Sequence, residues 1–185
     1  LADLRLTRDG GSNLLTGRQT LTSDDLTTWT LAGLGEITSA EGTYALELVS
    51  ADSSIVDLAG NPLATGAADG WATDATPPIV RILPVTSDPR NLPVTAVAFV
   101  FSEPVLNVAW TGLVLRRDGG ANLLTAANAV TSADGIVWTL SDLAALTASE
   151  GTYVLTIVAA GSGVTDLAGN VLTSDAVEIW RTDVS

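Results

Sequence analysis

The pentapeptide Asp-Leu-Ala-Gly-Asn occurs twice in this chain and combines oxygen-bearing side chains with a turn-forming sequence. Calcium in proteins binds about six to eight oxygen atoms from carboxylates, side-chain amides and backbone carbonyls. Each copy offers a carboxylate at its first position and an amide at its last, so both copies are candidate calcium-binding turns. The candidate ligands are Asp57, Asn61, Asp166 and Asn170.

Further acidic residues recur near the ends of the expected modules. Glu103 stands in Phe-Ser-Glu-Pro-Val, where the proline ends a strand, and Asp74 and Asp183 stand in linkers. The strand ends of a β-sandwich gather at two poles, so Glu103, Asp166 and a linker aspartate are expected to share one pole. One calcium ion bound there, at a domain junction, would stiffen the chain because two modules would share its ligands.

An ordinary tight turn is the alternative interpretation of the same pentapeptide. An aspartate at the first position of a turn accepts a hydrogen bond from the backbone two residues on, and Gly169 tolerates the left-handed conformation. The sequence around Asp166 also lacks the alternating acidic residues of an EF-hand loop. Calcium binding and a purely structural turn are therefore both open at the level of sequence.

The residue types missing from the chain exclude most catalytic chemistry. It contains no histidine, cysteine or lysine, which removes Ser-His and Cys-His catalysis, imidazole and thiolate metal ligands, and Schiff-base lysines. Glycoside hydrolysis would need two carboxylates held across a cleft, and no pair in the sequence marks such a cleft. We therefore expect no enzyme activity and no cofactor other than calcium.

The charge of the chain excludes two classes of partner. It carries 21 acidic residues against eight arginines, a net charge of −13. Nucleic acids and anionic membrane surfaces both select a basic face, whereas an acidic surface attracts cations. No apolar stretch approaches the roughly 20 residues that a membrane-spanning helix needs, so no membrane insertion is expected in this segment.

The sequence aligns with itself without a gap when Leu4 is matched to Leu113 and the same difference in residue number is kept along the chain. We call this difference the repeat offset. Residues 4–16 then align with residues 113–125, and the period is that of a small domain rather than of a solenoid repeat. The sequence therefore predicts a tandem repeat: a partial module at residues 1–73, which lacks its first strands, and a complete module at residues 74–185. The partial module is either completed by residues outside this segment or left open and prone to aggregation.

Short strands explain the apolar pattern of both modules. Tyr44, Leu46 and Leu48 alternate along one stretch so that they share one face, and turn sequences rich in glycine and aspartate separate such stretches. No long segment keeps the period of about 3.6 residues that a helix needs. We therefore predict an all-β fold, a Greek-key β-sandwich of about seven strands per module.

Two local motifs suggest how the strands are joined. Tyr44 and Tyr153 stand at the start of a late strand after a glycine, which is the position of a tyrosine corner in such sandwiches; a plain core tyrosine is the alternative. The sequence Arg-Asp-Gly-Gly, at residues 8–11 and 117–120, is expected to form a hairpin turn because glycine supplies the positive φ that such turns require.

Four of the five tryptophans form two pairs related by the repeat. Trp29 and Trp138 are expected in the core or between the sheets, and a surface that stacks against sugars is the alternative. Trp71 and Trp180 stand close to the linkers, where they would pack at the junction between modules. Whether these tryptophan side chains are buried therefore tests both the predicted fold and the alternative of sugar binding.

The order of the motifs resembles a known family. Asp-Ala-Thr-Pro-Pro from Asp74, Phe-Ser-Glu-Pro-Val from Phe101, Gly-Thr-Tyr-Val-Leu-Thr-Ile from Gly151 and the pentapeptide from Asp166 follow one another as in bacterial immunoglobulin-like (Ig-like) repeats, which occur in tandem in very large secreted or cell-surface proteins. The resemblance implies an extracellular, non-catalytic Ig-like β-sandwich that acts as a spacer, stalk or adhesive module. It also implies that calcium binds at domain junctions in some relatives.

These observations lead to one expected function and one alternative. We expect a structural or adhesive module of a large secreted or cell-surface protein, whose partners are the neighbouring Ig-like repeats and other surface proteins or glycans. The alternative is a carbohydrate-binding or accessory module attached to an extracellular enzyme. Buried tryptophans would favour the first function, and coplanar aromatic side chains exposed on one sheet would favour the second.

Overall fold

The computed structural model describes residues 1–185 and divides them into two compact units, Leu1–Ala75 and Thr76–Ser185. The boundary between the units lies in the same linker as the expected module boundary, two residues further along the chain. No helix of the structure is both long enough and apolar enough to cross a membrane.

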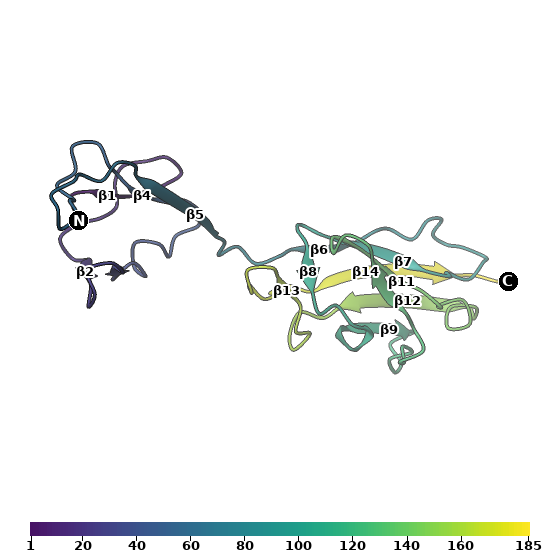
Figure 1. Ribbon diagram of the computed structural model, residues 1–185. Coiled ribbons are helices and arrows are strands. Elements are labelled where there is room, and N and C mark those ends of the chain that lie inside the picture. The colour runs from purple at the N-terminus through teal and green to yellow at the C-terminus, as the bar shows by residue number, and fades with distance from the viewer. The chain divides into compact units, whose positions relative to one another are not determined.

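The second unit is built from two antiparallel sheets (Figure 1). The first sheet has the strand order β10-β11-β7-β6, and the second has the order β14-β12-β9. The strands of the first sheet are β6 (Val80–Ile82), β7 (Val97–Phe101), β10 (Val130–Ser132) and β11 (Val137–Leu140). Those of the second sheet are β9 (Leu113–Arg117), β12 (Gly151–Ile157) and β14 (Ala176–Thr182).

This strand order identifies the second unit as an Ig-like sandwich. If its seven main strands are lettered A to G along the chain, one sheet contains A, B, E and D and the other contains C, F and G. That division is the Greek-key arrangement of constant-type Ig domains. The all-β, Ig-like prediction is therefore confirmed. The only helical element is the single turn η1 (Trp110–Gly112), and a short pair of strands joins β8 (Val105–Leu106) to β13 (Thr165–Asp166).

The core of the second unit lies between the two sheets and is formed by alternate residues of each strand. In β7, Val97, Phe99 and Phe101 are buried while the residues between them are only partly so. Leu155 and Trp180 of the opposite sheet are also fully buried. Because burying a large apolar side chain contributes about 1.5–3 kcal/mol, these inward positions hold the two sheets together.

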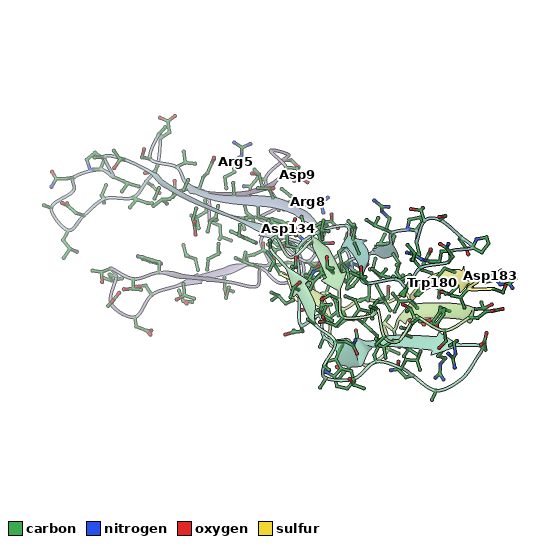
Figure 2. All side chains as sticks on the ribbon, turned by 90° about the vertical axis from the view of Figure 1, so that its right-hand side faces the viewer. Arg5, Arg8, Asp9, Asp134, Trp180 and Asp183 are labelled. Carbon is green, nitrogen blue, oxygen red and sulfur yellow. The ribbon has the colours of Figure 1, made fainter.

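Tyr153 forms the predicted tyrosine corner at the start of β12. Its hydroxyl donates a hydrogen bond of 2.8 Å to the carbonyl oxygen of Ser149, and its ring stacks on Trp180 with the centroids 5.5 Å apart. Tyr44 makes the equivalent bond to Ala40 in the first unit. The expectation that Trp180 packs between modules is wrong, because this side chain is fully buried within the second unit (Figure 2).

The expectation of a hairpin at Arg-Asp-Gly-Gly is also wrong. β9 and β10 belong to different sheets, so the chain crosses from one sheet to the other after the turn. The turn instead fastens β9 to β12, because the Asp118 carboxylate accepts a hydrogen bond of 2.8 Å from the backbone N–H of Thr152. Asp118 and Gly119 have φ values of 51° and 73°, which is the left-handed conformation that this tight reversal requires.

The first unit contains the counterparts of only five of these strands. One sheet has the order β1-β4-β5, and β2 pairs with β3 alone. The strands are β1 (Leu4–Arg8), β2 (Thr20–Thr22), β3 (Thr30–Ala32), β4 (Gly42–Leu48) and β5 (Ala67–Thr73). Their pairing registers repeat those of the second unit at the repeat offset: Leu4 lies opposite Leu48, and Leu113 lies opposite Ile157.

Strands equivalent to β6 and β7 are absent from the first unit, and this absence changes the environment of one tryptophan. Trp138 is partly buried against the core, and its indole N–H donates a hydrogen bond of 2.8 Å to the carbonyl of Gly135. Its counterpart Trp29 is 54% exposed. The core prediction is therefore wrong for Trp29, because the strand that should pair beside it is missing.

Candidate metal centre

Three of the sequence-predicted ligands come together where the linker meets the second unit. Asp166 ends β13 and lies opposite Val105 of β8. Glu103 lies in the turn between β7 and β8, and Asp74 lies in the linker. One carboxylate oxygen from each of the three residues lies within 4.8 Å of those from the other two.

This geometry suits a single hard cation. Two oxygens bound to one calcium ion at about 2.3–2.6 Å lie no more than roughly 5 Å apart, and the three carboxylates meet that limit. Carboxylates brought this close repel one another, so a bound cation is favoured. An all-oxygen donor set matches calcium or magnesium rather than zinc, which prefers nitrogen and sulfur ligands.

The pentapeptide positions the Asp166 carboxylate through a closed set of hydrogen bonds. The backbone N–H and the side-chain amide of Asn170 each donate a bond of 2.8 Å, one to each carboxylate oxygen of Asp166. The backbone N–H of Asp166 donates in return to the carbonyl of Asn170, and Gly169 has a φ of 94°. The predicted tight turn is therefore present, and Asn170 orients the carboxylate.

Asp166 is a buried carboxylate whose charge is maintained by these hydrogen bonds. The side chain is 1% exposed. Burial is the largest influence and raises the pKa of Asp166, but the hydrogen bonds from the side chain and backbone of Asn170, with smaller ones from Gly169 and Ala168, together lower that pKa below its ordinary value. The carboxylate is therefore ionised at neutral pH and ready to bind a cation.

The first copy of the pentapeptide forms the same turn without the acidic cluster. Asn61 donates bonds of 2.8 Å from its backbone and its side chain to the Asp57 carboxylate, and the side-chain bond is the main reason that the pKa of Asp57 is lowered. Asp57 is exposed, and the first unit has no residue equivalent to Glu103. Asp57 and Asn61 therefore lie outside the cluster.

Asp183 also lies outside the cluster. It follows β14 at the C-terminal end of the second unit, whereas β8 and β13 lie at the other end of this unit (Figure 1). Its carboxylate accepts a hydrogen bond of 2.7 Å from the Ser185 hydroxyl and forms an ion pair of 3.6 Å with Arg181. The Ser185 hydrogen bonds, followed by the charge of Arg181, lower the pKa of Asp183.

Two acidic turns that sequence reasoning did not single out clarify what a lowered pKa means here. Backbone N–H groups of the following residues donate to Asp25 and Asp134, and these bonds lower the pKa of both carboxyls. Neither residue belongs to the group of three clustered carboxylates. A lowered pKa alone therefore marks a turn in this fold, and the clustering distinguishes Asp166.

Comparisons with known proteins assign no family to the chain and find only distant similarity to solved structures. No protein-family model and no curated protein sequence matches it. A chimeric titin Z1Z2 carrying an exogenous peptide from decorin is similar at 15% identity and a TM-score of 0.34, over 97% of this chain and 80% of that one. Titin domains Z1Z2 in complex with telethonin are similar at 12% identity and a TM-score of 0.31, with the same coverage.

An I-band fragment of titin is similar at 12% identity and a TM-score of 0.36, over 97% of this chain and 54% of that one. TM-scores of this size do not establish a common structure, so the Ig-like assignment stands on the strand order of the second unit.

Proposed function

We propose that the chain is a non-catalytic structural module of a large secreted or cell-surface bacterial protein, in which Ig-like repeats follow one another in tandem. We further propose that calcium stiffens the linker before the complete module. The observation that carries the calcium proposal is the cluster of the linker carboxylate, Asp74, with Glu103 and Asp166. A cation held by all three would restrict the linker, because Asp74 would be tied to a folded sandwich.

Two features support a structural role over a catalytic one. The chain has no histidine, cysteine or lysine, so the common nucleophiles and bases are missing apart from carboxylates and hydroxyls. The inward-facing positions of the second unit are filled by large apolar side chains such as Phe99, Leu155 and Trp180, which are fully buried. A sandwich with a filled apolar core suits a structural module. Its partners under this proposal are the adjoining Ig-like repeats.

The extracellular, adhesive part of the proposal is supported by the motif order and the charge. The linker, strand and turn motifs follow one another as in bacterial Ig-like surface repeats, and the net charge of −13 favours solubility and attracts cations. Extracellular calcium is plentiful enough to fill sites whose Kd is about 10⁻⁴–10⁻³ M. Other surface proteins or glycans are further proposed partners.

The alternative, a carbohydrate-binding or accessory module, has less support. Trp29 is the only aromatic side chain among the large apolar residues that are exposed, and a missing neighbouring strand accounts for its exposure. Tyr44, Tyr153 and Trp180 are buried. The coplanar exposed aromatic residues that a sugar platform requires are therefore not a feature of these two units.

Thermal unfolding of the full chain in millimolar calcium, and again with excess chelator, tests the calcium proposal. At about one hundred times Kd, a ligand that binds only the folded state adds roughly 2.7 kcal/mol. We expect the unfolding transition of the second unit to rise by several degrees in calcium, and the rise to be lost in Asp166→Ala. Asp57→Ala is the matched control, because Asp57 occupies the same turn without the cluster.

Two outcomes would contradict the proposal. An unfolding temperature that calcium leaves unchanged would show that the cluster does not bind the ion at extracellular concentrations. A rise that Asp57→Ala abolishes as fully as Asp166→Ala would show that the effect of calcium does not depend on the cluster. Mutation of Glu103→Gln offers a check that leaves the turn intact, since Glu103 makes none of the hydrogen bonds of the pentapeptide.

A further inference from the structure

β9 is the outermost strand of its sheet and pairs with a strand on one side only (Figure 1). In an antiparallel sheet, alternate residues of such a strand direct their backbone N–H and C=O groups away from the paired neighbour. Unpaired groups of this kind form a template on which another chain can add a strand. The partners of these groups therefore show how the module protects the edge of β9.

The side chain of Asn122 binds two of the backbone groups along this edge. Its Oδ1 accepts a hydrogen bond of 3.0 Å from the backbone N–H of Leu115, and its Nδ2 donates one of 3.3 Å to the carbonyl of Leu113. Both groups belong to alternate residues of β9 and would otherwise be open to a further strand. The side-chain amide of Asn122 thus takes the place of a backbone peptide group in a neighbouring strand.

Backbone groups next to Asn122 bind further positions of the same edge. The N–H of Leu123 donates to the carbonyl of Leu115 over 2.8 Å, and the N–H of Gly120 donates to the carbonyl of Arg117 over 2.9 Å. The segment that follows the Arg-Asp-Gly-Gly turn therefore covers the edge of β9 before it crosses to the other sheet.

The first unit repeats this arrangement at the repeat offset. Asn13 accepts a hydrogen bond of 3.0 Å from the N–H of Leu6 and donates one of 3.3 Å to the carbonyl of Leu4. Each asparagine also accepts a bond from the residue two positions on, which is an ordinary Asx turn. The bonds to the strand join residues seven and nine positions apart, so the turn does not account for them.

The opposite edge of the second unit's sheet is closed by backbone pairing. β14 is the outermost strand on that side. Arg90 donates to the carbonyl of Arg181 over 3.0 Å and accepts a bond of 2.8 Å from the N–H of Asp183. The Asp88 carboxylate accepts a further bond of 2.8 Å from the N–H of Arg181. Because β14 is covered in this way, β9 is the edge at which the sheet depends on an asparagine side chain.

We propose that Asn122 and Asn13 are edge caps, side chains that prevent an edge strand from pairing with the same strand of a second copy of the chain. Without its cap, β9 exposes the N–H of Leu115 and the carbonyl of Leu113, which form a template for strand addition. The use of the caps between neighbouring repeats rests on the proposed tandem function, because linked modules of similar sequence meet at a high effective concentration.

The side chains of β9 permit such a pair once the cap is removed. An antiparallel pair of two β9 strands centred on Leu115 places Val114 of one copy opposite Arg116 of the other. Like charges that lie directly opposite one another destabilise a sheet, and this register avoids them. The two arginines of β9 therefore do not replace the cap.

Sedimentation velocity of the full chain carrying Asn122→Ala, over a series of concentrations, tests the proposal. We expect this variant to self-associate at about tenfold lower protein concentration than the parent chain, because the freed backbone groups gain partners in the pair. Asn128→Ala is the matched control. Asn128 lies in the same segment between β9 and β10 and binds one backbone N–H and one carbonyl, but these belong to Thr125 and Asp142 rather than to β9. The control should associate no more than the parent chain.

Hydrogen–deuterium exchange locates the association at the edge. In dilute, monomeric solution, the amide of Leu115 should exchange roughly tenfold faster in Asn122→Ala than in the parent chain, because it has lost its acceptor. At associating concentrations its exchange should slow again, since the strand of the second copy supplies a new acceptor. Calcium is not varied, so the outcome is independent of the proposed calcium site.

Two further variants keep the test decisive if Asn122→Ala loses its fold. Asn13→Ala makes the same change at β1, and Gln19→Ala is its control, because Gln19 binds Thr16 and Gly33 rather than the strand. Asn122→Asp retains an acceptor for the N–H of Leu115 and adds a charge that opposes strand pairing, so it should associate no more than the parent chain.

Three outcomes would overturn the proposal. The first is that the folded alanine variants at Asn122 and Asn13 sediment like the parent chain at every concentration. The second is that the control variants associate as strongly, which would trace association to lost stability. The third is that Asn122→Asp associates as strongly as Asn122→Ala.

Discussion

Asp57 and Asp166 occupy the same position of the same turn, and their surroundings give them different roles. Both carboxylates accept hydrogen bonds from the backbone and side chain of an asparagine four residues on. Only Asp166 is buried and adjoins two further carboxylates. At the scale of the residue, therefore, the local sequence determines the conformation of the turn. The carboxylates packed around it determine whether its aspartate can bind a metal ion.

The lowered pKa of Asp166 predicts an acid-dependent loss of stability. A carboxyl whose folded-state pKa lies below its ordinary value of 3.8 stabilises the fold above that pH, and the contribution is lost as the pH falls through the folded-state value. In urea unfolding between about pH 5 and 2, Asp166→Asn should therefore lose less stability than the parent chain. Equal slopes for the parent chain and Asp166→Asn would contradict the assignment.

The tyrosine corner predicts a second effect at the same scale. Tyr153→Phe removes the hydroxyl that donates to the Ser149 carbonyl and leaves the packing of the ring unchanged. Loss of a hydrogen bond to a shielded carbonyl costs about 1–3 kcal/mol, which thermal unfolding of the second unit would measure. Tyr44→Phe, the matched change in the first unit, should leave that transition unmoved; a shift by Tyr44→Phe alone would contradict the separation of the two units.

β4 and β12 are equivalent strands that differ in what covers them. β4 pairs with β5 over seven residue pairs, and β12 pairs with β14 over the same number. On its other side, β4 pairs with β1 and β12 pairs with β9. β12 also faces β6 and β7 across a filled core, whereas β4 has no such strands opposite it. Two strands with the same pairing inside their sheets can therefore differ in how deeply their side chains are buried.

Leu155→Ala and Leu46→Ala form a matched pair that measures this difference. Leu155 is fully buried, so its truncation should cost about 2–5 kcal/mol, while Leu46 is only partly buried and should cost clearly less. Hydrogen–deuterium exchange of the peptides that contain each strand reports both effects in one molecule. Equal costs at the two positions would show that the first unit is as well packed as the second.

At the scale of the whole molecule, the two units differ in completeness and so in resistance to opening. The second unit has both sheets of the sandwich, and the first has one full sheet and a two-stranded hairpin. Regions with fewer buried contacts open locally at a lower free energy. The chain is therefore expected to unfold in two steps rather than one.

Limited trypsin digestion should expose this order of opening. Arg8 and Arg117 are aligned arginines that end β1 and β9, and both are exposed. Cleavage that follows local opening tracks the free energy of that opening, so we expect cuts after Arg8 to precede cuts after Arg117. Mass spectrometry of the early fragments is the measurement, and simultaneous cleavage at both sites would argue against an open first unit.

The sequence by itself determined the local features of this protein. The alternation of residues such as Leu46 and Leu48 predicted strands, and the internal repeat that aligns Leu4 with Leu113 predicted the equivalence of the two units. Tyr153 was placed correctly because a tyrosine corner depends on residues a few positions apart. The turn formed by Asp166 and Asn170 was open to prediction for the same reason.

Only the tertiary structure decided which of these features meet in space. It separated Asp57 and Asp183 from the group formed by Asp74, Glu103 and Asp166, although all of them are acidic residues near turns or linkers. It also placed the strands on either side of Arg-Asp-Gly-Gly in different sheets and left Trp29 exposed. The physical reason is that pairing and burial depend on strands distant in the chain, and the first unit lacks two of the strands that would cover its core.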